Sequence, residues 1–346
     1  MRKRFLKQRR NRFRGDVDEK IAVVNSKSFG KFFPEHIQRL QASGEVDFHL
    51  FEPTIKGAQL AEALRDYQCI IASVTPTFDR TFFQNTPNLG LLCRHGLGVD
   101  NVDLSAATEN QVLVTKVLGP IERQAVAEHA IALLMNELRK INKGQRLIKN
   151  DEWHLRSSCN SFELKHATVG VIGYGNIGSK VGQILHEGFG AEVLVYDPYK
   201  SAEDIHKAKG KKVSLPELLS EADVITLHCN LSDENQRMLS DAAFDQMKQH
   251  VLLINTARGE LVDEAALIRA LARKEISGYA ADVFCQEPLE PTHPLLAFEN
   301  VTLTPHIGAY TSESLAGMGD HVVTNIERFF AQLEPFDLVN ERSWSV

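Results

Sequence analysis

Three ionisable side chains follow apolar runs in the C-terminal half of the sequence, and their types suit proton transfer and anion binding. Arg258 follows "HVLLINTA", Glu287 follows "AADVFCQ" and His306 follows "VTLTP". An arginine fork can bind a carboxylate through two parallel hydrogen bonds. A carboxylate on one ring nitrogen of a histidine fixes the tautomer and favours the protonated ring. We therefore expect these three residues to be catalytic, with His306 as the acid for carbonyl reduction and the base for alcohol oxidation.

Each of these residues also has an ordinary structural interpretation. An isolated Arg258 is more often a surface residue that pairs with Glu260 or Asp263, and a single histidine is more often a satisfied structural residue. Here, however, Glu287 and His306 each follow a strand-like run and each lies beside a proline. Loops at the carboxyl ends of parallel strands are where open α/β sheets bind ligands. The pattern therefore favours a site.

A glycine motif further upstream predicts a nucleotide cradle. Gly173, Gly175 and Gly178 form G-x-G-x-x-G between a strand-like run and a helical pattern, and a second apolar run ends at Asp197, 19 residues after Gly178. Such glycines allow a tight turn, close approach of a pyrophosphate and tight helix–strand packing. An acid at the end of the second strand can bind the ribose hydroxyls and would repel a 2′-phosphate. The motif thus favours NAD over NADP, against the alternative of a plain helix–strand turn.

The elements that must position these residues alternate between short apolar runs and amphipathic stretches. Expected strands in the first part are 20–25, 46–50, 69–73, 91–94 and 112–115, with helices near 34–42, 57–65 and 103–109. A long helical stretch over 122–149 follows. From about residue 167 the sequence predicts six strands with intervening helices, and an amphipathic helix lies near 312–331. Uninterrupted apolar runs separated by helices indicate parallel sheets covered on both faces.

Composition excludes several classes of protein. Hydrophobic residues make up 43% and charged residues 24% of the 346 residues, as in an ordinary globular protein, and no apolar run is long enough to span a membrane. The first 14 residues contain eight Lys or Arg, although the whole chain carries a charge of −6. The rest is therefore acidic, which argues against nucleic-acid binding. The basic start lacks the apolar stretch of a secretory signal. We expect residues 1–16 to be a disordered tail. The alternatives are a segment that contacts another subunit or a polyanion, and a targeting segment.

The five cysteines are scattered without a C-x-x-C pair, which predicts reduced structural thiols, no metal site and a cytoplasmic protein.

The sequence resembles the D-isomer specific 2-hydroxyacid dehydrogenase family, in its phosphoglycerate dehydrogenase-like branch. Four motifs carry the resemblance, which runs from about residue 20 to 340: "RHGLGVDNVD", "VGVIGYGNIG" with "YDP", "NTARGELVDE", and "DVFCQEP" with "TPHIGA". The resemblance implies an enzyme that interconverts a D-2-hydroxy acid and its 2-oxo acid with NAD. D-3-phosphoglycerate, glyoxylate or hydroxypyruvate, and bulkier acids all remain open as substrates.

The resemblance also assigns roles to individual residues. Arg258 would bind the substrate carboxylate and carbonyl, and Glu287 would support His306. Asp282 would hold the nicotinamide carboxamide, helped by the backbone around Thr256 and Ala257. The residues expected to contact NAD are Gly173, Gly175, Asn176, Ile177, Gly178, Asp197, His228, Asn230, Thr256, Ala257, Asp282 and Gly308. The substrate would be held by Arg258 and by the backbone of Gly96, Leu97 and Gly98.

The fold implied by the resemblance has two doubly wound parallel-sheet domains, with a Rossmann NAD-binding domain inserted into a flavodoxin-like substrate domain. We expect the substrate domain at 17–120 and 309–346 and the NAD-binding domain at 121–308. A homodimer built through the cofactor domain is expected, with a small-molecule substrate and neither a nucleic acid nor a membrane as partner. Because the chain ends soon after "LVNE", no C-terminal regulatory domain is expected.

Three positions depart from the family pattern without removing a catalytic residue. Lys116 stands where Asn is usual, Gln124 where a small hydroxyl residue is frequent, and Asn230 where Pro is usual. A phosphorylated substrate would need basic residues nearby, for which Lys116, Arg123 and Arg94 are candidates. Two other functions compete: an NAD(H)-sensing corepressor-like binding protein, and formate oxidation. Glu287 argues against the latter, because the formate enzymes carry Gln there.

Overall fold

The structure, a computed structural model, describes residues 19–340, so the predicted basic tail at 1–16 lies outside the described residues. The described chain divides into two compact units. The first unit comprises residues 19–122 and 311–340, and the second unit comprises residues 123–310. None of the helices within residues 19–340 has the length and apolar character needed to cross a membrane.

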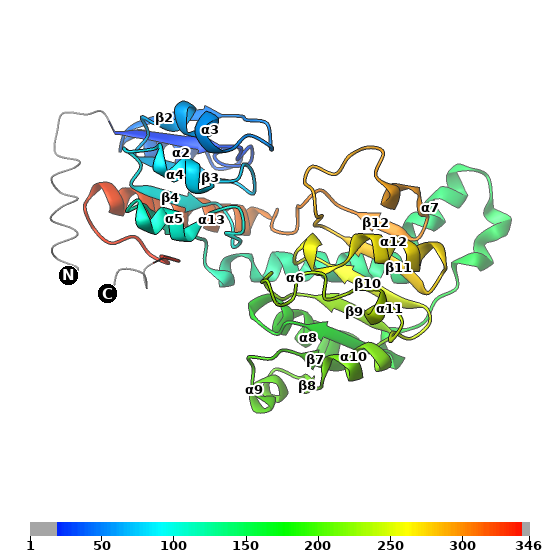
Figure 1. Cartoon of the computed structure of the whole chain (residues 1–346). Coiled ribbons are helices and arrows are strands. Elements are labelled where there is room, and N and C mark those ends of the chain that lie inside the picture. Colours follow the sequence, from blue (N-terminus) through cyan, green and yellow to red (C-terminus); the bar gives the residue numbers. More distant parts are fainter. Residues whose placement is uncertain (1–18, 341–346) are drawn as a thin grey trace. The chain divides into compact units, whose positions relative to one another are not determined.

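The first unit is built on a five-stranded parallel sheet with the order β2-β1-β3-β4-β5 (Figure 1). This is the flavodoxin-like strand order. The strands are β1 (Lys20–Val24), β2 (Glu45–His49), β3 (Cys69–Ala72), β4 (Leu91–Arg94) and β5 (Leu113–Thr115), and the helices are α2 (Pro34–Gln41), α3 (Gly57–Leu64), α4 (Arg80–Gln84), α5 (Leu104–Glu109) and α13 (Ser312–Phe330).

The second unit is built on a seven-stranded parallel sheet with the order β12-β11-β10-β9-β6-β7-β8 (Figure 1). Its strands are β6 (Thr168–Ile172), β7 (Glu192–Tyr196), β8 (Lys211–Lys212), β9 (Val224–Leu227), β10 (Val251–Asn255), β11 (Ile276–Ala281) and β12 (Val301–Leu303). The helices are α7 (Ile141–Lys149), α8 (Asn176–Phe189), α9 (Ala202–Lys207), α10 (Leu215–Glu221), α11 (Asp241–Phe244) and α12 (Glu264–Ala272), with 3-10 turns η1 (Trp153–Cys159), η2 (Leu164–His166), η3 (Gly259–Leu261) and η4 (Pro294–Ala297). The order is that of a doubly wound dinucleotide-binding sheet, which reverses between β6 and β9.

Alternate residues of the central strands supply two separate cores, one on each face of the second sheet. In β10, Leu253 packs into the cluster that includes Leu218 of α10, whereas Ile254 packs into the cluster that includes Leu185 of α8. Because successive side chains of a strand point to opposite faces, a sheet covered on both faces needs apolar residues at every position. This explains the uninterrupted apolar runs, and the predicted fold class is confirmed.

Three elements differ from the sequence-based prediction. The sequence predicted six strands in the second unit, and the sheet has seven. The missed strand, β8, is a two-residue edge strand made of lysines and has no apolar signal. The five-residue α4 was also missed; its N-cap is Asp79, whose carboxylate accepts a hydrogen bond from the Phe82 N–H at 2.8 Å. The long helical stretch is two helices, because α6 (Gly119–Leu138) ends before Lys140, which has a left-handed backbone with φ of 54°.

Candidate active site

His306 and Glu287 meet at the carboxyl edge of the second sheet. Glu287 follows β11 and His306 follows β12, and the His306 Nδ1 lies 2.7 Å from the Glu287 Oε2. The other carboxylate oxygen, Oε1, accepts a hydrogen bond from the Phe284 N–H at 3.0 Å, which fixes the carboxylate. With Nδ1 bound to an acceptor, Nε2 is the nitrogen left to exchange a proton. The His306 side chain is 34% exposed, so this nitrogen belongs to a ring that a small molecule can reach.

Arg258 is positioned by a buried asparagine that the sequence analysis did not identify. Asn255, the last residue of β10, is fully buried; its Nδ2 donates to the Arg258 carbonyl at 2.8 Å and its Oδ1 accepts from the Ala257 N–H at 3.0 Å. A Cβ on the next residue, Gly259, would lie 2.1 Å from the carbonyl carbon of Phe284. The loop that carries Arg258 therefore packs directly on the loop that carries Glu287. An asparagine at the end of an apolar strand was the signal that could have revealed this.

Asp282 is a buried carboxylate surrounded by donors. Its Oδ1 accepts hydrogen bonds from the Thr304 hydroxyl at 2.6 Å and the Ile307 N–H at 2.9 Å, and its Oδ2 accepts one from the Gly308 N–H at 2.7 Å. Burial raises the pKa of Asp282, but hydrogen bonds from His129, Thr304 and Ile307 outweigh burial, so the pKa is lowered overall. An ionised carboxylate accepts only, which suits the predicted contact with an amide N–H of the nicotinamide. Thr304 is the second residue that the sequence analysis missed.

The glycine motif has the geometry of a cradle. Gly173 has φ of 86°, and a Cβ there would lie 2.5 Å from the Cys229 nitrogen, while a Cβ on Gly178 would lie 2.0 Å from the Gly173 oxygen. A Cβ on Gly175, by contrast, would have no atom within 4 Å. Gly175 is the N-cap of α8 and has no side-chain capping bond, so the N–H groups of Asn176 and Ile177 lie at an uncapped helix N-terminus. Open space above such N–H groups fits a pyrophosphate.

Asp197 lies at the end of β7, beside this cradle. Its Oδ2 accepts from the Tyr174 N–H at 2.8 Å, and its Oδ1 accepts from the N–H groups of Tyr199 at 2.9 Å and Lys200 at 3.2 Å. A carboxylate has about four acceptor positions, so about one remains for a ribose hydroxyl. The structure thus fits the predicted ribose contact. Asp197 also fixes the backbone of the glycine motif, at Tyr174, and of the segment after β7, at Tyr199 and Lys200.

Four further predicted residues lie around the cradle and the Arg258 loop. The Cβ of His228 lies 3.1 Å from the position of a Cβ on Gly178, and its Nε2 lies 2.8 Å from the Thr226 hydroxyl. Burial lowers the pKa of His228 to about 3, so the ring is neutral. Asn230 is exposed and its carbonyl accepts from Asn235. Thr256 and Ala257 are both buried, and the Thr256 hydroxyl has no hydrogen-bond partner among residues 19–340, which leaves it able to bind a ligand.

The loop of Gly96, Leu97 and Gly98 lies in the first unit and follows β4. It is held by Arg94, which is 3% exposed and donates from Nε to the Gly98 carbonyl at 2.7 Å and from Nη1 to the Ala72 carbonyl at 2.8 Å. Arg94 was a candidate for binding a substrate phosphate, but these bonds turn its guanidinium toward the backbone. Of the other residues singled out in the sequence, Lys116 directly follows β5 and is partly exposed. The Gln124 amide donates a hydrogen bond to the Glu128 carboxylate. The Arg123 Nε is buried without a hydrogen-bond partner in the described chain.

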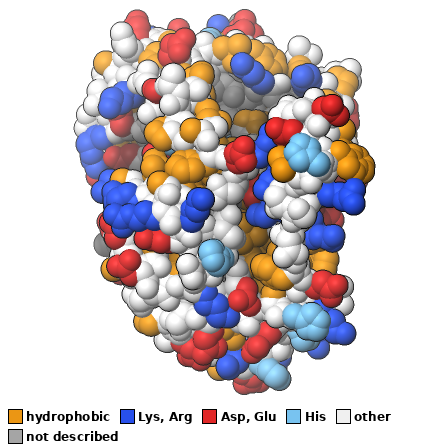
Figure 2. Space-filling model, turned by 90° about the vertical axis from the view of Figure 1, so that its right-hand side faces the viewer, with side chains coloured by type: hydrophobic (Ala, Val, Ile, Leu, Met, Phe, Trp, Pro, Cys, Tyr) orange, Lys and Arg blue, Asp and Glu red, His pale blue; other side chains and the backbone are white. Residues whose placement is uncertain are grey.

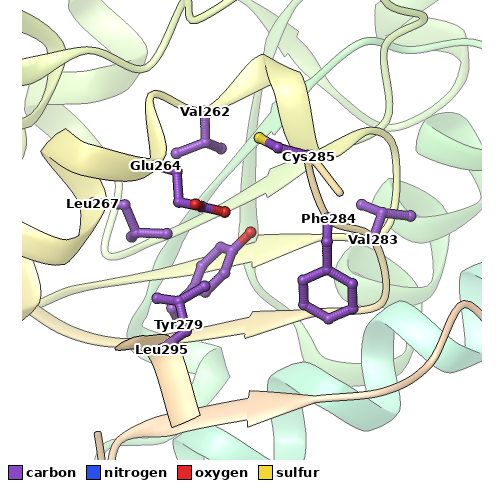
Figure 3. Close-up of a pocket in the computed structure, with 9 residues that line it drawn as sticks. Val262, Glu264, Leu267, Tyr279, Val283, Phe284, Cys285 and Leu295 are labelled. Carbon is purple, nitrogen blue, oxygen red and sulfur yellow. The ribbon is translucent and has the colours of Figure 1, made fainter. Parts of the chain in front are cut away.

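A small pocket is lined partly by the loops that carry Arg258 and Glu287, at Gly259, Phe284 and Cys285, but Arg258, Glu287 and His306 do not line it. Figure 3 shows the Tyr279 hydroxyl directed toward the Glu264 carboxylate, with Phe284 and Cys285 on the opposite side. Burial, reinforced by the nearby carboxylates of Glu264 and Glu260, raises the pKa of the Cys285 thiol to about 11, so it stays protonated at neutral pH. Since the thiolate is the reactive form, this pocket lacks an activated nucleophile.

Comparison with known proteins identifies the family. Residues 131–308 match the family model described as "D-isomer specific 2-hydroxyacid dehydrogenase, NAD binding domain". The chain is 31% identical over 309 residues to a glyoxylate reductase of Korarchaeum cryptofilum, covering 88% of this chain and 92% of that protein. It is 35% identical over 282 residues to a D-3-phosphoglycerate dehydrogenase of Archaeoglobus fulgidus, covering 82% of this chain but only 53% of that protein.

The solved structures support the same family assignment. D-lactate dehydrogenase of Aquifex aeolicus, complexed with NAD and lactic acid, superposes with a TM-score of 0.80 at 28% identity, covering 92% of this chain and 99% of that one. The chain belongs to the D-isomer specific 2-hydroxyacid dehydrogenase family. It is an NAD-dependent oxidoreductase, as the motifs predicted, and its relatives do not support the alternative of an NAD-sensing corepressor.

Proposed function

We propose that the protein reduces a small, unphosphorylated 2-oxo acid, such as glyoxylate or hydroxypyruvate, to the D-2-hydroxy acid. The observation that carries the proposal is the 2.7 Å contact between His306 and Glu287, beside the loop of Arg258. A histidine whose Nδ1 is bound to a carboxylate can hold a proton on Nε2 and deliver it to an oxygen.

The proposed roles follow from the chemistry of each side chain. Arg258 binds the substrate carboxylate and polarises the carbonyl, and the N–H groups of Gly96, Leu97 and Gly98 hold the carboxylate. NADH, when bound, supplies the hydride that adds to C2. His306 transfers its Nε2 proton to the carbonyl oxygen, and Glu287 stabilises the imidazolium before that transfer. Asp282, Thr256, Ala257 and Gly308 position the nicotinamide, while Gly175, Asn176, Ile177 and Asp197 bind the pyrophosphate and ribose, flanked by His228 and Asn230.

Two observations support a small substrate over a phosphorylated one. Arg94 donates to the Gly98 and Ala72 carbonyls, which engages one of the three basic candidates for a phosphate site. Glyoxylate reductases recur among the similar proteins, including those of Korarchaeum cryptofilum at 31% identity and Aeropyrum pernix at 32% identity. Phosphohydroxypyruvate is the second candidate substrate, because Lys116 is a basic residue that could bind its phosphate.

The test is the loss of NADH absorbance with a panel of glyoxylate, hydroxypyruvate, phosphohydroxypyruvate and a bulkier 2-oxo acid. The highest kcat/KM should belong to glyoxylate or hydroxypyruvate. A preference for phosphohydroxypyruvate that Lys116→Ala abolishes would replace the proposal with phosphoglycerate dehydrogenase activity. Turnover of none of these acids by protein that binds NADH would refute it.

We further propose a homodimer formed through the second unit. Exposed apolar side chains are concentrated in α7 and the segment after it, where Ile148 is 64%, Trp153 61% and Phe162 41% exposed. The face in Figure 2 is the one on which α7 lies, and groups of hydrophobic side chains are visible there among the charged ones. Several exposed apolar residues within one short segment of the chain support a protein–protein interface.

Replacing Ile148 and Trp153 together by Lys should convert a dimer into a monomer in light scattering coupled to size-exclusion chromatography. Phe48→Lys, on β2 of the first unit at 52% exposure, is the control and should leave the dimer intact. A wild-type monomer, or a dimer that survives the double substitution, would refute this interface.

We also propose that the first unit, residues 19–122 and 311–340, corresponds to the substrate domain predicted at 17–120 and 309–346, and that the second unit, residues 123–310, corresponds to the NAD-binding domain predicted at 121–308. A cytoplasmic location remains a proposal that rests on the five scattered cysteines, all of which are free thiols.

A further inference from the structure

His129 of α6 lies against the carboxylate that is proposed to hold the nicotinamide. Its Nε2 is 2.9 Å from the Thr304 hydroxyl and 3.3 Å from the Asp282 Oδ1, and its Cδ2 is 3.6 Å from the position of a Cβ on Gly308. All four residues belong to the second unit. The His129 side chain is 19% exposed and that of Asp282 is 4% exposed, so the contact is largely shielded from water.

The hydrogen-bond inventory fixes the tautomer of His129. The Thr304 hydroxyl has a single proton, and it donates that proton to the Asp282 Oδ1 at 2.6 Å. The hydroxyl oxygen can then only accept from His129, so the His129 Nε2 must carry a proton. The Asp282 Oδ1, which is ionised and accepts only, faces the same N–H. His129 is thus a donor to both groups.

We infer that His129 is a positioning residue for the nicotinamide, acting through Thr304 and Asp282. It keeps the Asp282 carboxylate ionised and in one orientation, with Oδ1 occupied by His129, Thr304 and Ile307. Oδ2 accepts one hydrogen bond from the Gly308 N–H, which leaves it the less occupied oxygen for an amide donor. This inference rests on the proposed role of Asp282.

Without the His129 N–H, the Asp282 carboxylate loses that donor, and the Thr304 hydroxyl, no longer polarised by a donor of its own, donates to Oδ1 more weakly. Buried donors and acceptors that act as a unit are coupled in this way. The effect should fall on the carboxamide end of the cofactor, because the pyrophosphate and the adenosine ribose are bound by Gly175, α8 and Asp197.

The test compares two ligands that differ by the nicotinamide. Dissociation constants of NADH and ADP-ribose are measured by calorimetry for the wild type, His129→Phe and His129→Gln. His129→Phe should weaken NADH about tenfold and change ADP-ribose by less than about twofold. His129→Gln, whose amide N–H can take the place of Nε2–H, should restore NADH affinity to within about threefold.

The matched control is His293→Phe. His293 has similar exposure, at 16%, and its Nε2 pairs with Glu264 at 3.1 Å, so it is a partly buried histidine–carboxylate pair outside the proposed cofactor contacts. It should leave both dissociation constants unchanged. If His129→Phe does not fold, His129→Asn, whose amide is too short to reach Thr304, should show the same split between the two ligands.

Equal loss of NADH and ADP-ribose affinity in the His129 variants would mean a general structural role and would overturn the inference. Unchanged NADH affinity in His129→Phe would also overturn it, as would a failure of His129→Gln to restore binding. Because the assay needs no substrate, it decides the role of His129 even if no 2-oxo acid is reduced, an outcome that would refute only the proposed function.

Discussion

The two units use the same edge of the same kind of sheet in different ways. In the second unit, the loops after β10, β11 and β12 carry ionisable side chains, Arg258, Glu287 and His306. In the first unit, the loop after β4 carries glycines, and Arg94, the last residue of β4, is buried and bonded to backbone carbonyls. In the proposed function, one unit therefore places side chains to do chemistry, and the other places backbone N–H groups to bind an anion. Substitutions should consequently affect turnover in the second unit, and affect stability and substrate binding in the first.

The largest effect should come from His306. His306→Asn removes the ring that transfers the proton, while asparagine tolerates the left-handed backbone that His306 adopts, with φ of 52°. We expect kcat to fall about 1000-fold, with the dissociation constant of NADH within about twofold of wild type. Stopped-flow single-turnover rates and NADH fluorescence titration give the two values. Loss of NADH binding in a folded variant would mean that His306 holds the cofactor and that the proposed division of labour is wrong.

A substitution of Arg94 tests the other side of the comparison. Arg94→Met fills the same space but removes the side-chain donor to the Gly98 carbonyl and one of two donors to the Ala72 carbonyl, which keeps the His95 N–H. One buried acceptor left unsatisfied costs about 1–3 kcal/mol, so the free energy of unfolding should fall by about 1–3 kcal/mol. The KM for the 2-oxo acid should rise as the loop loosens, while the NADH dissociation constant stays constant. Urea unfolding and steady-state kinetics measure these quantities.

The control is Arg65→Met, because Arg65 is 55% exposed and pairs only weakly with Glu62 across 3.4 Å. It should change the free energy of unfolding by about 0.5 kcal/mol or less. If Arg94→Met lowers kcat while KM and stability stay at their wild-type values, Arg94 takes part in catalysis, and the contrast between the units fails.

Substitution of Asp197 should have a smaller effect on cofactor binding. This carboxylate is proposed to bind the ribose and also accepts hydrogen bonds from the backbone. Asp197→Ala would leave three backbone N–H groups without an acceptor, so Asp197→Asn is the cleaner substitution. Removing the charge should weaken NAD binding about tenfold and relax discrimination against NADP. Asp204→Asn, on the neighbouring α9, is the control. An unchanged ratio of NAD to NADP affinity in Asp197→Asn would exclude Asp197 as the ribose ligand.

The same contrast explains what the sequence could reveal. The fold class followed from apolar runs, because both faces of each sheet are buried and leave an uninterrupted pattern. The cradle followed from Gly173, Gly175 and Gly178, whose spacing reflects local steric demands. The lysine-only β8 and the break at Lys140 escaped prediction, because a two-residue edge pairing and a single left-handed residue leave no periodic signal.

The supporting residues escaped for a different reason. Arg94 bonds to Ala72, and His129 lies against Thr304, 175 positions away in the sequence. Only the folded sheet brings such pairs together, so no local spacing encodes them. Asn255 acts within its own loop, yet it resembles any strand-end asparagine until its two partners are known.

The smallest expected effect is on the pH dependence of the free energy of unfolding, and it involves one histidine from each unit. Burial, with the positive charge of Arg94 as a second cause, lowers the pKa of His95 in the first unit to about 3, and burial lowers that of His228 in the second unit to about 3. Both rings stay neutral in the folded protein, whereas the unfolded chain protonates them near pH 6.5. As the pH falls from 6.5 toward 3, the unfolded state therefore binds more protons, and the free energy of unfolding decreases.

At pH 5.5 each ring should cost about 1 kcal/mol relative to pH 7.5. Urea unfolding at these two pH values measures the difference. His95→Asn should remove about 1 kcal/mol of pH dependence from the unfolding of the first unit, and His228→Asn the same from the second, whereas His186→Asn, at an exposed position of α8, should remove none. If His228→Asn reduces the pH dependence but His95→Asn leaves it unchanged, the His95 ring is hydrated in solution. In that case the loop of Gly96 to Gly98, which His95 directly precedes, would be more open to water than the cradle beside His228, and the two units would differ in rigidity as well as in chemistry.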